Sequence, residues 1–152
     1  MTVLAAALDI HVLSVVWWIG GLAFVTAVIL PALLSGRPGD ARAIFELIES
    51  RFAPQARIAV LLVGLSGLYM LFRLDLWNWF AQLRFWWLDA MVLFWLLFFL
   101  LLFIIEPAGL LERLAHQDDD QRRWLRMQRM HLALLLIALA IIAGAVAGSH
   151  GF

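Results

Sequence analysis

The sequence predicts an all-α fold, an integral membrane four-helix bundle that forms a single domain over residues 1–152. Hydrophobic residues make up 65% of the chain and charged residues only 14%, which is far from the composition of a water-soluble domain. One crossing of the hydrocarbon core takes about 20 mostly apolar residues, so this length holds about four crossings with short links. The lipid bilayer is therefore the first partner that the composition implies.

Four apolar runs predict the spans, at about residues 8–34, 55–73, 85–106 and 130–149. The first run closes at Pro31, before a turn-rich stretch of Ser, Gly and Pro. Asp40 is placed to cap a short amphipathic helix at the membrane interface, and Pro54 is expected to kink the junction of this helix with the second span.

The distribution of arginine predicts the orientation in the membrane. The links after the first and third spans hold nine of the eleven basic residues, and only Arg73 and Arg84 lie on the other side. Because cytoplasmic loops carry the excess of Arg and Lys, we expect both termini outside the cytoplasm. The sequence thus predicts a multi-pass protein of a bacterial-type inner (plasma) membrane.

Two features of the composition narrow the chemistry. The chain has no cysteine, which excludes disulfides, thiolate metal sites, iron–sulfur clusters and covalently attached c-type haem. The formal net charge is zero, so no basic surface predicts a nucleic-acid partner. Any cofactor must therefore be held by His, Met, carboxylate or backbone groups.

His11 is the strongest candidate for a functional residue. It lies about one turn inside the first span, and Trp18 continues its face at helical spacing. An ionisable group inside an apolar span costs several kcal/mol unless it is paired, hydrated or bound to a ligand. One interpretation is a hydrated histidine near the headgroups, hydrogen-bonded to Asp9, Asp89 or a carbonyl group.

The alternative interpretation of this imidazole is an axial ligand to haem b, with the flat macrocycle packed on Gly20–Gly21 and Trp18. His150 lies at matching depth in the fourth span and is a candidate for the second ligand. Met91 and Met70 are near the same depth, and a thioether is a possible ligand as well.

A metal ion is the main alternative to haem. Copper or zinc would be held at the outer face by three side chains, those of His11, Asp89 and His150.

Two further ionisable residues, Arg57 and His131, lie toward the opposite, cytoplasmic face. They are expected either to form an interfacial pair with Glu106 or lipid phosphate, or to contact a haem propionate or a quinone.

The pattern His11-(x)6-Trp18-(x)-Gly20-Gly21-Leu22 resembles the opening helix of the superfamily of HemJ-type protoporphyrinogen oxidases and CopD copper-resistance proteins. Three later segments are similar in order and spacing, namely Phe45-Glu46…Glu49…Arg51, Trp87-Leu88-Asp89-Ala90-Met91 and Arg122 to Arg129. The HemJ-type pattern has His and Lys where this chain has Asp89 and Met91, so the resemblance does not extend to the oxidase reaction. It implies a b-type haem or a metal ion between the helices.

Together these observations predict a haem b-binding membrane redox protein, with a membrane oxidoreductase as the enzyme class to test. Its electron-transfer partner would be a quinone or a redox protein. The alternatives are a copper or zinc protein with a site at the outer face, and a non-catalytic membrane subunit that serves as a scaffold.

Overall fold

The computed structural model describes residues 2–35, 38–108 and 120–149, and all the regular secondary structure in these ranges is helical. The long elements are α1 (Val3–Phe24), α3 (Pro38–Leu74), α4 (Trp86–Leu100) and α6 (Asp120–Ser149). Two π-helical turns and a short helix extend them, namely η1 (Val25–Ile29), α2 (Leu30–Ser35) and η4 (Leu101–Ile105). The link between α3 and α4 contains two 3₁₀ turns, η2 (Leu76–Trp79) and η3 (Leu83–Phe85). The predicted all-α fold is therefore confirmed.

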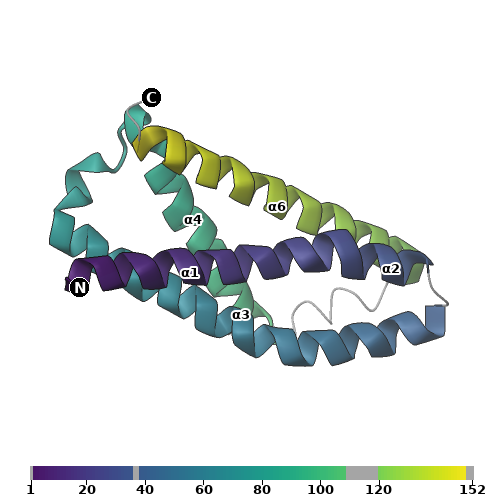
Figure 1. Ribbon diagram of the computed structural model, residues 1–152. Coiled ribbons are helices and arrows are strands. Elements are labelled where there is room, and N and C mark those ends of the chain that lie inside the picture. Colours follow the sequence, from purple (N-terminus) through teal and green to yellow (C-terminus); the bar gives the residue numbers. More distant parts are fainter. Residues whose placement is uncertain (1, 36–37, 109–119, 150–152) are drawn as a thin grey trace.

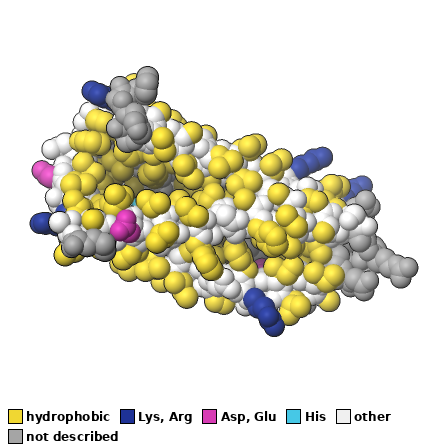
Figure 2. Space-filling view, in the orientation of Figure 1, with side chains coloured by type: hydrophobic (Ala, Val, Ile, Leu, Met, Phe, Trp, Pro, Cys, Tyr) yellow, Lys and Arg dark blue, Asp and Glu magenta, His cyan; other side chains and the backbone are white. Residues whose placement is uncertain are grey.

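Four helical stretches are long and apolar enough to cross a membrane, namely Val3–Ser35, Ala43–Leu74, Leu83–Ile105 and Arg122–Gly148. Large hydrophobic side chains also cover much of the outer surface (Figure 2). Leu13, Leu65 and Leu93, on three different helices, are each 65–68% exposed. Contiguous exposed apolar surface of this extent is unusual in a soluble monomer and suits contact with lipid tails.

Two helices are longer than the sequence predicts. The first helical stretch begins at Val3, before the predicted start at about residue 8, and runs through Pro31 to Ser35, close to the predicted end at residue 34. The expected interface helix and the second span are one continuous helix, α3, which passes through Pro54. α1 lies along α3, while α6 contacts α2 near one end of the molecule and also packs on α4 (Figure 1).

Both π-helical turns stand directly before a proline. In η1 the Leu30 amide bonds to the Val25 carbonyl, and Pro31 follows. In η4 the Glu106 amide bonds to the Leu101 carbonyl at 2.9 Å, and Pro107 follows. A proline has no N–H, and its ring clashes with the carbonyl four residues earlier. Widening the preceding turn from an i−4 to an i−5 pattern relieves that clash and lets the helix reach the proline.

Aromatic side chains fill the space between the helices. Trp18, which is 5% exposed, packs edge-on against Phe98 with ring centroids 4.9 Å apart. The Trp95 indole donates a hydrogen bond to the Val60 carbonyl at 2.8 Å and crosses α3 at Gly64, where a Cβ atom would overlap the ring. This contact fixes α4 against α3 at the level of the bundle where the candidate site lies.

Candidate functional site

A cavity of about 570 Å³ lies between α1, α3, α4 and α6. Its walls are almost entirely apolar and include Trp18, Met70, Trp87 and Met91, with His11 as the one ionisable side chain among the described lining residues. Figure 2 shows a hollow with hydrophobic walls toward the end of the molecule that carries the N-terminus. The volume falls within the range of about 300–1,000 Å³ that is usual for cofactor and ligand pockets.

The hydrogen bonds of His11 determine which ring nitrogen carries the proton. Nδ1 lies 3.1 Å from the Val63 carbonyl oxygen and 3.1 Å from Ser66 Oγ. The Ser66 hydroxyl itself donates to the Leu62 carbonyl at 2.5 Å, so its oxygen accepts from the imidazole. Because both neighbours of Nδ1 are acceptors, the proton of the neutral ring belongs on Nδ1. Nε2 therefore keeps its lone pair.

The position of the imidazole depends on α3. A Cβ atom at Gly67 would lie 3.2 Å from His11 Cε1, which is closer than most Cβ contacts, so a glycine is favoured at this position. Ser66 is buried, and its hydroxyl donates a hydrogen bond to a carbonyl of its own helix, as serine commonly does within apolar helices. One turn of α3 thus orients a side chain of α1.

The structure brings together four of the candidate residues that the sequence analysis named. His11, Trp18 and Met91 all line the large cavity, and Met70 joins them from α3. Of the partners expected for His11, the carbonyl group is the one observed, and Asp9 is exposed on α1. His150 lies outside the described residues, so its place relative to the cavity is not described.

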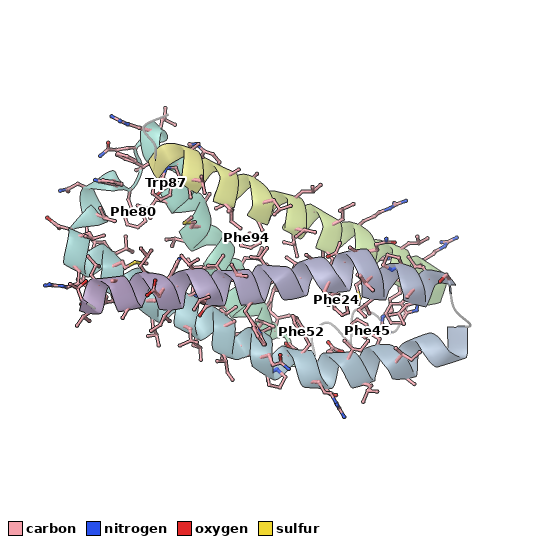
Figure 3. The ribbon with its side chains drawn as sticks, in the orientation of Figure 1. Phe24, Phe45, Phe52, Phe80, Trp87 and Phe94 are labelled. Atoms are coloured by element: carbon pink, nitrogen blue, oxygen red, sulfur yellow. The ribbon has the colours of Figure 1, made fainter. Side chains whose placement is uncertain are left out.

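Gly21 does not present an open face to a macrocycle in this structure. A Cβ atom at Gly21 would overlap the ring of Phe52, which already fills that small face, and Gly20 faces open space away from the core. Figure 3 shows Phe52 projecting from α3 into the space beside α1. The glycines that line the large cavity are Gly64 and Gly67 of α3.

The side chain of Asp89 forms hydrogen bonds to the link between α3 and α4. Both of its carboxylate oxygens accept from the Ala81 amide at 3.3 Å, and Ala81 has a positive φ of 60°. Within residues 2–35, 38–108 and 120–149, no three His, Asp or Glu side chains form a cluster that would hold a metal ion. The described part of the chain therefore offers no support for the triad of His11, Asp89 and His150.

Arg57 and His131 do not line the large cavity. Arg57 Nη2 forms an ion pair with Glu106 Oε1 at 2.8 Å, and its Nε donates to the Leu102 carbonyl at 3.1 Å. That carbonyl would accept from the Glu106 amide in a regular α-helix, but the π-helical turn directs this amide to Leu101. The expected contact with Glu106 is confirmed, and Arg57 also satisfies a carbonyl that η4 leaves open.

Trp87, whose side chain lines the large cavity, carries a buried donor without a hydrogen-bond partner among the described residues. The indole Nε1 of Trp87 makes no hydrogen bond to any residue that the structure describes. Trp87 comes from α4 and lies close to α6 at Gly148, where a Cβ atom would overlap it (Figure 3). Most buried donors in native proteins are satisfied, so this indole N–H, packed against α6, is an exception among the described residues.

Sequence reasoning missed the residues that hold His11. Val63 and Ser66 lie 52 and 55 positions further along the chain, and neither is unusual in an apolar span. Ser66 was the only available clue, because it is a hydroxyl residue within an uncharged run. Trp87 was named from the sequence only within the resemblance, and its side chain lines the cavity.

No protein-family model, curated protein or solved structure matches the chain. The resemblance of the His11, Trp18 and Gly20–Gly21 pattern to HemJ-type and CopD proteins therefore stays a prediction.

Proposed function

We propose that this protein is a membrane redox protein that binds haem b in the large cavity, with His11 as an axial ligand. The observation that carries the proposal is the hydrogen bonding of His11, whose Nδ1–H is directed to the Val63 carbonyl and Ser66 Oγ. Metal-ligating histidines almost always donate their other ring N–H in this way, which fixes the tautomer and raises the basicity of the ligating nitrogen.

The cavity fits a large, flat, mainly apolar group. It is about 570 Å³ in volume, and its described lining contains one imidazole, two thioethers and many aromatic and aliphatic side chains. Apolar walls with a few placed polar atoms are the usual composition of a cofactor pocket.

The second axial ligand would come from Met91 or Met70, which line the cavity, or from His150. When bound, a haem supplies one-electron oxidation and reduction, and its axial ligands adjust the potential. The protein's contribution is to hold the His11 ring at a fixed angle through α3 and to line the site with aromatic walls.

The test of this proposal is the absorption spectrum of the purified protein together with its pyridine haemochrome. We expect a Soret band, an α band that appears on reduction, and about one haem per chain. A colourless protein, purified from cells supplied with a haem precursor, would reject the proposal and turn attention to the scaffold alternative.

Copper is the second candidate, and the place of the methionines favours it over zinc. His11, Met70 and Met91 line one cavity, and thioether and imidazole ligands suit Cu(I). The same preparation separates the two cofactors, because elemental analysis would find copper where the haemochrome assay finds no haem.

We also propose that the protein lies in a bacterial-type inner membrane with both termini outside the cytoplasm. The proposal rests on the nine-to-two division of arginine between the links, and α1 begins at the end of the bundle where α6 ends (Figure 1).

A periplasmic reporter fused after Phe152 should therefore be active, and a cytoplasmic reporter at the same position should be inactive. As a matched control, the two reporters should exchange their behaviour when fused after Gly39, in the first arginine-rich link. The opposite pattern at both positions would invert the orientation.

A further inference from the structure

A second, smaller cavity lies next to the first. Its volume is about 160 Å³, and its aromatic walls come from Trp18, Phe45, Phe52 and Phe98. Figure 3 shows Phe45 and Phe52 side by side on α3, both in the space next to the helix formed by α1, η1 and α2. An apolar cavity of about 150 Å³ is known to hold one benzene molecule, so this space matches a single six-membered ring.

The two π-helical turns contribute to this cavity. Val25 and Ile29 of η1 and Leu102 of η4 all line it. Widened turns of this kind are rare and frequently mark functional sites. Because a π-helical turn precedes each of two prolines, the local sequence maintains the shape of the cavity from two helices.

The charges beside this cavity favour an uncharged ligand. Glu106 lines it, but the carboxylate is paired with Arg57 at 2.8 Å, so the pair contributes no net charge. Glu49 is an exposed side chain that also lines the cavity. A cation would compete with Arg57 for Glu106, whereas a neutral ring leaves the ion pair intact.

His131 gives the cavity a hydrogen-bond acceptor. Its Nδ1 lies 2.9 Å from the Met127 carbonyl oxygen, one turn earlier on α6. A carbonyl only accepts, so in the neutral ring the proton belongs on Nδ1 and the lone pair on Nε2. Nε2 has no hydrogen-bond partner among the residues that the structure describes, and the side chain lines the cavity.

We propose that the small cavity binds an aromatic ring that carries a hydroxyl group, with the hydroxyl donating to His131 Nε2. This chemistry is shared by the head group of a membrane quinol and by a free phenol. Trp18 lines both cavities, so its indole ring is a common wall between the ring site and the large cavity. The proposal stands without haem, because none of its contacts involves His11.

Calorimetric titration of the protein in detergent micelles with phenol and with toluene tests the proposal. The two rings are similar in size, and only phenol can donate a hydrogen bond. Each ligand is compared between variants in the same micelles, so that its partition into detergent cancels. In the His131→Phe variant we expect phenol to bind about fivefold more weakly, the usual net effect of one hydrogen bond, and toluene to bind as before.

A second variant tests the cavity independently of the histidine. Ala53 lines the cavity, and Ala53→Leu fills part of it, so both rings should bind more weakly while the helical circular dichroism is unchanged. Unaltered binding of phenol to Ala53→Leu would overturn the site, even if His131→Phe failed to fold. Equal losses of phenol and toluene in a folded His131→Phe would overturn the role of Nε2.

A third ligand, a quinol with a short alkyl tail, distinguishes whether the site binds the head group of a membrane quinol or a free phenol. If it binds more tightly than phenol and loses affinity in both variants, the site takes a membrane quinol head group. If phenol binds as tightly as the tailed quinol, the site takes a free phenol. Binding of neither ligand to the wild-type protein would overturn the proposal, and haem content, measured separately, would be unaffected by that outcome.

Discussion

Replacement of His11 by alanine should remove most of the bound haem from the purified protein. Loss of a residue that only supports a ligating histidine commonly lowers metal affinity about 10- to 100-fold, so loss of the ligand itself should lower haem affinity by more than about tenfold. The measurement is pyridine haemochrome per mole of protein, with copper determined in the same samples.

Two further variants serve as controls for the His11→Ala result. Ser66→Ala removes one of the two acceptors of His11 Nδ1 and leaves the Val63 carbonyl, so its haem loss should be smaller than that of His11→Ala. His116→Ala, in a polar stretch of the sequence between Ala115 and Gln117, should retain full haem. Full haem occupancy in His11→Ala would refute the assignment of the ligand.

Replacement of Arg57 by glutamine should destabilise the protein by about 2–3 kcal/mol. Breaking a fully buried ion pair costs about 3–5 kcal/mol, and the value expected here is lower because the side chains of Arg57 and Glu106 are 34% and 27% exposed. The variant also leaves the Leu102 carbonyl, which η4 has released, without its donor. The measurement is the free energy of unfolding in mixed micelles of increasing SDS content.

Arg84→Gln is the matched control, because Arg84 is exposed in the link and only approaches the Phe85 ring, at 5.7 Å. Its effect should stay below about 1 kcal/mol. Adding Glu106→Gln to Arg57→Gln should restore part of the lost stability, since no unpaired charge then remains. Equal unfolding free energies for Arg57→Gln and Arg84→Gln would show that the ion pair contributes nothing.

Helical structure and the number of membrane-length helices followed from the sequence because they depend on local composition. Runs of about 20 apolar residues predict membrane-length helices whatever surrounds them, and the four runs correspond to four helices. The cost of an ionisable group in such a run also singled out His11 and Arg57 before any contact was known. For Arg57 the sequence even suggested the partner, Glu106.

The prolines mark the limit of local rules. Local rules disfavour a proline inside a helix, yet the first helical stretch passes through Pro31 to Ser35 and α3 is continuous through Pro54. The rule describes a regular i−4 ladder, whereas the turn before Pro31 widens to i−5 and avoids the clash. Whether a helix ends before a proline or continues through a π-helical turn depends on how the following residues pack. The local sequence does not specify that packing.

The sequence by itself determined that His11 needs a partner, and only the tertiary structure decided that Val63 and Ser66 provide it. Helical periodicity specifies which residues share a face of one helix, so it correctly joined His11 to Trp18. It does not specify which face of another helix lies opposite, and for that reason Gly21 was assigned to a cofactor although Phe52 fills it. The tautomer of His11 and the shape of both cavities depend on contacts between helices, and these contacts form only when the helices pack.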